Sequence, residues 1–473
     1  MEQNKYYKGH IVVVPYPSQG HINPLLQFAK RLASKGVKAT IATTRYTVES
    51  ICAANVGLEP ISDGFDEGGF AEAKSEEVFF KSFKANGSST LSQVILKFRN
   101  TDSPVNCIVY DSFLPWALDA AREHGIYGAA FFTNSATVSS IFCRIHNGTL
   151  SLPLEEENMP LSSIAGVPPL NFRDLPSFLR LPESYPVYLA MKLSQFSNLE
   201  KADWVFANTF EELEPGVAEG VSKHWPAKLI GPMVPSAFLD GRIEGDKGYG
   251  ASLWKPLSEE CIKWLETKVP KSVVYVSFGS MVSLTEKQMG EIAWGLKESG
   301  KYFLWVVKEH ERHRLPNGFI ESVKEKGLIV PWCNQLEMLA HEAIGCFVTH
   351  CGWNSTLEGL SLGVPMVGIP QWADQLPDAK FIGEIWEVGV RPQEDEKWVV
   401  RREELIACLK EVMEGKRSQK IKKNCILWRE RAKEAIGEGG SSDKRIDEFV
   451  WFLRSEKRKN EEAKKFMNGN GVH

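Results

Sequence analysis

The sequence lacks the features that mark membrane proteins, secreted proteins and nucleic-acid binders. None of its apolar stretches is long enough to span a bilayer as a helix, and its formal net charge of −4 provides no basic surface for nucleic acid or anionic lipid. The polar residues at its start are not followed by the apolar core of a signal peptide. We therefore expect a cytoplasmic monomer that binds neither nucleic acid nor membranes.

The sequence also has little that would form disulfides or hold a metal ion. Its nine cysteines are scattered and odd in number, which is typical of reduced thiols in the cytosol. Cys346, His350 and Cys351 lie near one another, but their spacing matches no zinc pattern. The chain contains no Asp-x-Asp motif. We expect neither a metal ion nor any other cofactor.

The composition is that of a globular protein with more than one domain. Of the 473 residues, 43% are hydrophobic and 25% are charged, and the chain is too long for one ordinary domain. Short apolar runs alternate with helical patterns, which predicts α/β domains with parallel sheets. We predict an N-terminal domain at residues 1–240, a linker at 241–260 and a C-terminal domain at 261–440. A C-terminal helix at 441–455 and a flexible tail at 456–473 follow.

One histidine near the start of the chain is placed for chemistry. Residues 11–14 form an apolar run typical of a buried parallel strand, and a loop rich in turn residues follows. His21 ends this loop, where a helical pattern begins that stops at Gly36. Such folds bind ligands at the carboxyl end of a strand, and the positive end of a helix dipole favours the neutral imidazole that a general base requires. The alternative is a purely structural histidine.

Two further polar residues follow predicted strands in the same part of the chain. Asp111 ends the apolar run 105–110, and Thr133 ends the run 128–132. Because the carboxyl ends of parallel strands share one edge of a sheet, we expect Asp111 to lie near His21. The alternative for Asp111 is a helix cap without a chemical role.

The stretch from Trp332 to Gln375 predicts a nucleotide-binding unit. It contains the apolar run 345–349, a polar turn at His350, a helix that opens at Trp353 and ends at Gly363, and a second apolar run 365–370. The free N–H groups and positive dipole at that helix start suit a phosphate.

Other side chains of this stretch suit the remaining parts of a sugar nucleotide. Glu358 lies one helical turn further on and can accept hydrogen bonds from ribose hydroxyls. Trp332 follows the predicted strand 328–330 and can stack on a base. Asp374 and Gln375 are adjacent polar groups suited to sugar hydroxyls.

This stretch resembles, nearly residue for residue, the signature box of plant UDP-dependent glycosyltransferases of secondary metabolism. By this resemblance Trp332 stacks on uracil, Gln335 supports the nucleoside and Glu358 holds the ribose. The diphosphate partners it implies are His350, Asn354 and Ser355, with Ser280 after the predicted strand 272–277, and the sugar partners are Trp353, Asp374 and Gln375. Cys333 belongs to the same donor-binding set. Relatives tend to read Asp-Gln-x-Thr-Asn-Ala-Lys here, whereas this chain has Leu376-Pro377-Asp378 after Gln375.

The resemblance also implies the fold, the reaction and the substrates. It implies the GT-B architecture, in which two Rossmann-like domains face each other across a cleft and the C-terminal helix packs back on the N-terminal domain. His21 would be the base and Asp111 its partner, and Thr133 would touch the sugar or phosphate. The reaction implied is inverting transfer of glucose from UDP-glucose, a co-substrate, to a hydroxyl of a small lipophilic phenolic, terpenoid or steroid. The irregular segment 150–199 would line the acceptor pocket.

Two other functions are compatible with a sugar-nucleotide-binding fold of this kind. One is a sugar-nucleotide epimerase, which would need acid and base carboxylates and no large acceptor pocket. The other is a non-catalytic binder of a sugar nucleotide or of a small lipophilic molecule. The segment 150–199 argues against the epimerase, and the presence of both His21 and Asp111 argues against the binder.

Overall fold

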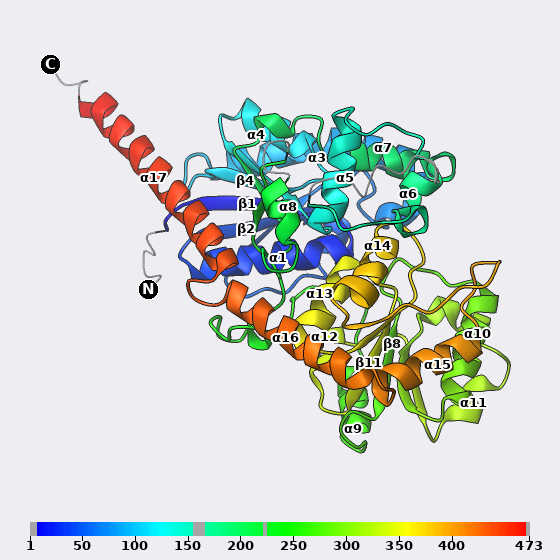
Figure 1. Ribbon diagram of the computed structural model, residues 1–473. Coiled ribbons are helices and arrows are strands. Elements are labelled where there is room, and N and C mark those ends of the chain that lie inside the picture. Colours follow the sequence, from blue (N-terminus) through cyan, green and yellow to red (C-terminus); the bar gives the residue numbers. More distant parts are fainter. Residues whose placement is uncertain (1–6, 155–165, 221–224, 470–473) are drawn as a thin grey trace. The chain divides into compact units, whose positions relative to one another are not determined.

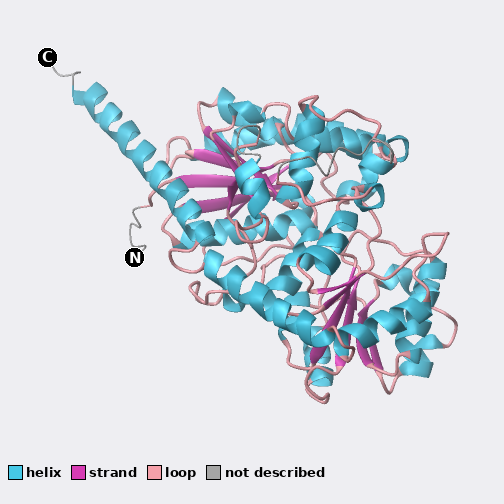
Figure 2. Ribbon diagram, viewed as in Figure 1, coloured by secondary structure: helices cyan, strands magenta, loops and turns pink. Residues whose placement is uncertain are grey.

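The computed structural model describes residues 7–154, 166–220 and 225–469, which form two compact units. The first unit contains Met1–Ser151, Tyr185–Leu253 and Glu434–His473, and the second contains Leu152–Ser184 and Trp254–Lys433. Figure 2 shows a group of strands inside each unit, with helices around it. This is the predicted class, two parallel sheets flanked by helices.

The first unit is built on a seven-stranded parallel sheet in the order β3-β2-β1-β4-β5-β6-β7. Its strands are β1 (His10–Val14), β2 (Lys38–Thr44), β3 (Gly57–Ile61), β4 (Cys107–Asp111), β5 (Tyr127–Phe132), β6 (Trp204–Ala207) and β7 (Lys228–Leu229). After β1 the chain adds strands on one side of it, and it then returns to add β4 on the other side. The connections after β1 and β4 therefore diverge, which is the point where open α/β sheets bind ligands.

Helices cover both faces of this sheet (Figure 1). They are α1 (Gln19–Ser34), α2 (Arg45–Val48), α3 (Glu76–Phe98), α4 (Trp116–Glu123), α5 (Ala136–His146), α7 (Pro186–Ser194), α8 (Pro215–Gly220) and α17 (Ser441–Gly469). Phe28 of α1 packs on Phe206 of β6 with ring centroids 5.3 Å apart, and Phe449 of α17 packs on Phe206 at 5.1 Å. This aromatic cluster joins the C-terminal helix to α1 and the sheet.

The second unit repeats the plan with a six-stranded parallel sheet in the order β10-β9-β8-β11-β12-β13. Its strands are β8 (Val273–Ser277), β9 (Tyr302–Val306), β10 (Gly327–Val330), β11 (Ile344–Thr349), β12 (Met366–Gly368) and β13 (Gly389–Val390). The order reverses between β8 and β11, so this sheet has its own divergence point. The longer helices around it are α9 (Ser258–Leu265), α10 (Glu286–Glu298), α13 (Trp353–Leu362), α15 (Arg402–Met413) and α16 (Ser418–Ile436).

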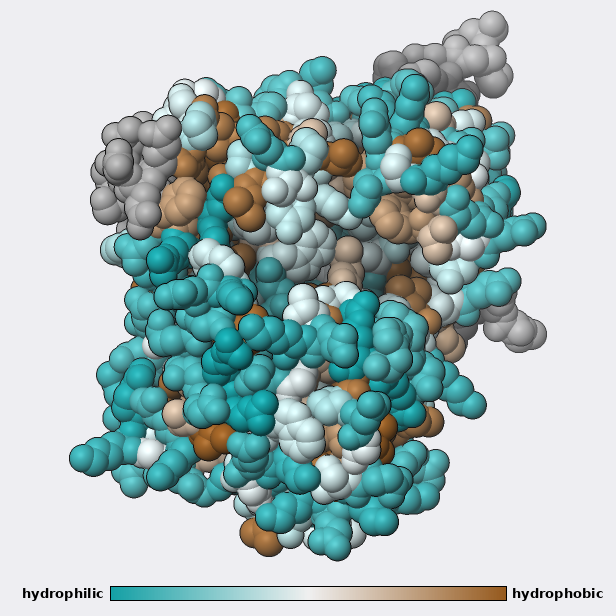
Figure 3. Space-filling view, turned by 90° about the vertical axis from the view of Figure 1, so that its right-hand side faces the viewer, coloured by the Kyte–Doolittle hydropathy of each residue, from teal (hydrophilic) through white to brown (hydrophobic). Residues whose placement is uncertain are grey.

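The surface is largely polar. Figure 3 shows one face covered mostly by hydrophilic residues, with hydrophobic residues in small separate groups. Across the described ranges, the structure has no helix with the length and apolar character needed to cross a membrane.

The described part of the segment 152–184 belongs to a different unit from the one predicted. The sequence pattern places it in the first domain, whereas its described part belongs to the second unit. A buried carboxylate explains the difference, because Asp174 lies 2.7 Å from Nζ of Lys380 and 3.0 Å from Nη1 of Arg391. A buried charge requires such partners, and both lie in the second unit.

The C-terminal helix continues beyond the predicted limit at residue 455, and α17 ends at Gly469. The sequence beyond 455 is rich in Glu and Lys, which favour helix even without an apolar face to bury. The pattern read as a flexible tail therefore forms helix, and residues 470–473 lie outside the described residues.

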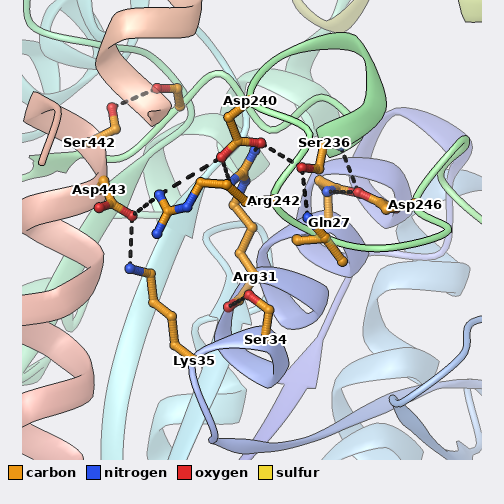
Figure 4. Close-up of polar contacts among 12 residues, drawn as sticks. Gln27, Arg31, Ser34, Lys35, Ser236, Asp240, Arg242, Asp246, Ser442 and Asp443 are labelled. Carbon is orange, nitrogen blue, oxygen red and sulfur yellow. Dashed lines mark hydrogen bonds and ion pairs between the residues drawn. The ribbon is translucent and has the colours of Figure 1, made fainter. Parts of the chain in front are cut away.

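A buried polar network attaches the predicted linker to α1 (Figure 4). Asp246 accepts hydrogen bonds from Gln27 at 2.6 Å and Lys30 at 2.9 Å, and Asp240 accepts one from Arg31 at 3.0 Å. The first part of the predicted linker 241–260 is thus docked on the helix that carries His21. The division between the two units falls within this linker, after Leu253.

The start of α17 joins the same network through Asp443, which lies 2.7 Å from Nζ of Lys35 and 3.0 Å from Nη1 of Arg242. Burial alone would raise the pKa of the Asp443 carboxyl. The hydrogen bond and charge of Lys35 and the N–H of Gly439 outweigh burial and hold this pKa below its ordinary value. A lowered folded-state pKa means that Asp443 stabilises the protein above the unfolded-state pKa, and that this contribution is lost as the pH falls through the folded-state value.

Two aspartates that share Lys35 provide a matched test of this network. The side chain of Asp443 is 4% exposed and that of Asp447 is 58% exposed, although both lie 2.7 Å from Lys35. We expect Asp443→Asn to lower the free energy of unfolding by roughly 2–3 kcal/mol, because a buried carboxylate loses its charge-assisted hydrogen bonds to Lys35 and Arg242. Asp447→Asn should cost less than about 0.5 kcal/mol. Urea unfolding at pH 7 measures both, and equal losses would show that the buried network contributes no extra stability.

Candidate active site

The first candidate site lies where β1 and β4 diverge. His21 is in the first turn of α1, which follows β1, and Asp111 is the last residue of β4. Nδ1 of His21 lies 2.6 Å from Oδ2 of Asp111. The Asp111 side chain is fully buried, while that of His21 is 15% exposed. The sheet therefore brings together two residues that are far apart in the sequence, as expected from their places after neighbouring strands.

This hydrogen bond sets the protonation of the imidazole. An ionised carboxylate only accepts hydrogen bonds, so Nδ1 carries the proton and donates it to Asp111. In the neutral ring Nε2 then has a free lone pair, which a general base needs. The hydroxyl of Thr133 lies 3.2 Å from the same Nδ1. Thr133 therefore contacts the histidine itself. The resemblance implies only a contact with the sugar or phosphate.

Asp111 also has a local structural role, although it is not a helix cap. Its Oδ1 accepts a hydrogen bond from the N–H of Phe113 at 3.0 Å, and the N-cap position of α4 belongs to Pro115. One carboxylate oxygen thus stabilises the turn after β4, and the other faces His21. Asp111 therefore has a structural contact as well as its contact with His21, but the helix-cap alternative is wrong.

The structure adds two aromatic neighbours of the histidine and a lysine that packs on one of them. The ring of Phe113 lies 4.6 Å from that of His21 and the ring of Tyr16 lies 5.3 Å away, so aromatic surface surrounds the imidazole. Nζ of Lys192, a buried residue of α7, lies 4.6 Å from the centre of the Phe113 ring and donates to Oδ1 of Asn134 at 2.7 Å. Phe113 follows Asp111 closely, which is a usable signal, but nothing in the sequence links Lys192 to His21.

The second candidate site lies where β8 and β11 diverge, in the other unit. Nε2 of Gln335 donates to Oγ of Ser355 at 2.9 Å and to Oε2 of Glu358 at 2.6 Å. Ser355 and Glu358 are both buried residues of α13. Three residues that the resemblance assigns to one donor are therefore in direct contact.

The residues around Trp332 have different environments. The Trp332 ring lies 4.6 Å from that of Trp254, a neighbour that sequence reasoning missed. The Cys333 side chain is only 4% exposed, and its Sγ lies 3.6 Å from the hydroxyl of Tyr275. The thiol thus points into the protein, so any donor contact of Cys333 falls to its main chain.

His350 lies in a cradle formed by two glycines. A Cβ added to Gly279 would lie 2.7 Å from Cε1 of His350, and one added to Gly352 would lie 2.5 Å from its Nε2. Burial lowers the pKa of His350 to about 4, although the charge of Asp374 opposes this effect. His350 is therefore neutral at physiological pH, and its ring can offer an N–H group but no positive charge.

The remaining predicted donor residues lie at the starts of two helices. Asn354 is in the first turn of α13, next to Trp353, whose buried ring lies 6.2 Å from that of Trp386. Asp374 precedes α14 (Gln375–Lys380).

The unusual residues after Gln375 leave the helix start intact. Pro377 occupies the first turn of α14, where its missing N–H has no helical partner to lose. Oε1 of Gln375 accepts N–H groups of Gln371 at 2.9 Å and Trp372 at 3.2 Å. Only the amide nitrogen of Gln375 is left to meet a sugar. Within the described residues, no group of three or more His, Cys, Asp or Glu side chains is placed to hold a metal ion.

One Rossmann-like sheet carries an oriented histidine. The other carries a polar turn, a helix start and a buried carboxylate. These features define a nucleotide-sugar-dependent glycosyltransferase. Comparison with known proteins agrees. Residues 222–431 match the family described as UDP-glucoronosyl and UDP-glucosyl transferase, and residues 9–60 match the N-terminal domain of glycosyltransferases.

Individual relatives cover nearly the whole chain. UDP-glycosyltransferase 74B1 of Arabidopsis thaliana is 54% identical over 94% of this chain and 98% of its own length. The flavonol 7-O-beta-glucosyltransferase UGT74F1 of the same plant is 46% identical, with 94% and 98% covered. The crystal structure of Os79 from O. sativa in complex with UDP is 39% identical, with a TM-score of 0.90 over 94% of this chain and 100% of that one. The chain belongs to the UDP-glycosyltransferase family.

A pair of glycines with the same backbone conformation tests the cradle around His350. Gly279 and Gly300 both have φ of +69°, but a Cβ at Gly300 would meet only Nζ of Lys326 at 3.9 Å. Alanine at either position should cost about 1 kcal/mol of stability, because a side chain is strained at positive φ. Only Gly279→Ala should also weaken binding of UDP, because its methyl group displaces His350. Calorimetric titration with UDP would contradict this prediction if both variants bound UDP equally well.

Proposed function

We propose that the protein transfers glucose from UDP-glucose to a hydroxyl of a small lipophilic acceptor, with inversion at the anomeric carbon. The observation that carries this proposal is the 2.6 Å contact between Nδ1 of His21 and Asp111, which leaves Nε2 free to act as a base. A relative named a flavonol 7-O-beta-glucosyltransferase supports glucose as the sugar and a phenolic hydroxyl as one acceptor class. Terpenoid and steroid alcohols are further candidate acceptors.

In the proposed reaction, Nε2 of His21 accepts the acceptor's hydroxyl proton as its oxygen attacks the anomeric carbon. The bond from that carbon to the phosphate oxygen of UDP breaks, and UDP leaves with the electron pair. The ring becomes an imidazolium, whose charge the buried carboxylate of Asp111 stabilises. One displacement at the sugar converts the α-linked donor into a β-glucoside.

The donor is assigned to the second site, where each part of it has a candidate partner. Trp332 would stack on uracil, Gln335 would support the nucleoside and Glu358 would accept the ribose hydroxyls. The growing negative charge on the diphosphate would be stabilised by neutral His350, by Ser280 and by the free N–H groups at the start of α13. We propose that no metal ion or other cofactor takes part, and that the enzyme acts as a monomer in the cytoplasm.

An assay of UDP release with simultaneous detection of glucoside tests the function. We expect both products with UDP-glucose and a phenol in the presence of excess EDTA. His21→Ala should lower turnover by about two to four orders of magnitude, the usual contribution of a positioned base, while UDP binding stays near that of wild type. Epimerised sugar nucleotide without glucoside would indicate an epimerase, and binding without turnover would indicate a binder. Loss of activity in EDTA that magnesium or manganese restores would contradict metal independence.

Asp111→Asn separates the chemical role of this residue from its structural one. Asparagine retains an oxygen for the N–H of Phe113, so we expect thermal stability close to that of wild type. It supplies no charge to the imidazolium and can hold the ring in the wrong tautomer, so turnover with aliphatic alcohols should fall by at least about 100-fold. The loss should shrink with acidic phenols, which ionise with less help from a base. Unchanged turnover with alcohols would leave Asp111 a purely structural residue.

A further inference from the structure

The loop between β8 and α10 is held by polar contacts as well as by packing. This loop carries Ser280, and the next residue, Met281, is 56% exposed. Under the loop lies a small cavity lined partly by Val282, Leu284 and Trp305. Because the cavity leaves part of the loop without packing partners, side-chain hydrogen bonds add to the packing of buried Val282 and Leu284.

A buried lysine from the neighbouring strand supplies two of these hydrogen bonds. Lys308 follows β9, which pairs in parallel with β8, so its side chain starts from the same edge of the sheet as the loop. Nζ of Lys308 donates to the carbonyl oxygen of Ser280 at 3.2 Å and to that of Val282 at 2.7 Å. Lys308 is only 8% exposed. Two loop carbonyls thus face a buried ammonium group.

The 3-10 helix after Lys308, residues Glu309–Arg314, completes the contacts with the loop. With three residues per turn, such a helix places Lys308, Glu311 and Arg314 on one side. Oε2 of Glu311 lies 3.6 Å from Nζ of Lys308, and its Oε1 accepts the hydroxyl of Ser283 at 2.6 Å. Nη1 of Arg314 donates to the carbonyl of Leu284 at 2.8 Å. Three spaced charged residues therefore hold the loop at four successive points.

We propose that Lys308 is a positioning residue for the diphosphate of the donor. In this proposal Glu311 and Arg314 hold Lys308 and the loop in their positions. This inference rests on the proposed function, which assigns the diphosphate to Ser280 and His350. Two carbonyl oxygens near an anion would repel it, and Lys308 binds both of them. Its positive charge also acts on His350, whose pKa it helps to lower after the larger effect of burial. Lys308 thus favours a loop that presents hydroxyl and N–H groups to phosphate oxygens.

Comparison of UDP with uridine isolates the diphosphate from the rest of the donor. In Lys308→Met, which keeps the length of the side chain without its charge, we expect the Kd of UDP to rise about tenfold or more and that of uridine to stay unchanged. Lys308→Arg should restore most of the UDP affinity. Lys326→Met is the matched control, because Lys326 also donates to a loop carbonyl, that of Gly300 at 2.9 Å, at the other end of β9. Calorimetric titration of each folded variant gives both constants.

Ser283→Ala keeps the test decisive if Lys308→Met does not fold. It leaves the charged groups in place and removes the contacts that Glu311 and Arg314 make with the Ser283 hydroxyl, so the Kd of UDP should rise about two- to threefold at nearly unchanged melting temperature. The inference is overturned if folded Lys308→Met has the wild-type ratio of UDP affinity to uridine affinity. If Lys308→Met does not fold, the same result in Ser283→Ala overturns it. An equal loss of UDP and uridine affinity also overturns it, because it indicates a general defect. Wild-type protein that fails to bind UDP would instead refute the proposed function.

Discussion

The reversal of strand order in each parallel sheet is the constraint on which both sites depend. Where the chain leaves neighbouring strands in opposite directions, their carboxyl ends are left open to a ligand. Between β1 and β4 this point holds His21 and Asp111, and between β8 and β11 it holds Ser280 and His350. The same arrangement of strands therefore occurs twice, and the proposed function assigns the base to the first site and the diphosphate to the second. Each site draws residues from distant parts of the sequence because the strands, and not the loops, set their positions.

The two sites handle charge in different ways. In the first unit a buried carboxylate is placed directly against the imidazole, so the charge that appears during proton transfer has a partner already in position. In the second unit the histidine is kept neutral by burial, and positive charge is held one layer away on Lys308. A distant cation and aligned N–H groups can bind a diphosphate and still release UDP after the reaction. This arrangement is consistent with a nucleotide that serves as a leaving group.

Much of the fold and many of the site residues could be predicted because short-range patterns determine them. Buried parallel strands appear as apolar runs, and the stretch from Trp332 to Gln375 shows strand, turn, helix and strand in order. The long helix α3 escaped prediction because its buried residues, such as Phe79, Phe83 and Leu91, are diluted by polar residues on its other sides. Strand β3 is only partly buried and lacks a continuous apolar run.

Contacts between residues far apart in the chain could not be predicted from the sequence. Asp174 binds Lys380 and Arg391, which attaches the segment 152–184 to the second unit, and no local pattern signals this pairing. Lys192 beside Phe113 is a similar case, because the two residues meet only through packing in the tertiary structure. A helical tail was read as flexible because it has no apolar face, although its Glu and Lys content favours helix without one.

The configuration of the product tests the central claim most directly. A single displacement driven by His21 must convert the α-linked glucose of UDP-glucose into a β-glucoside, because the acceptor attacks from the face opposite the departing UDP. Proton NMR of the glucoside formed distinguishes the two anomers. We predict the β-anomer alone. An α-glucoside would require two displacements or a different attack geometry, and it would contradict a mechanism with one base and no covalent intermediate.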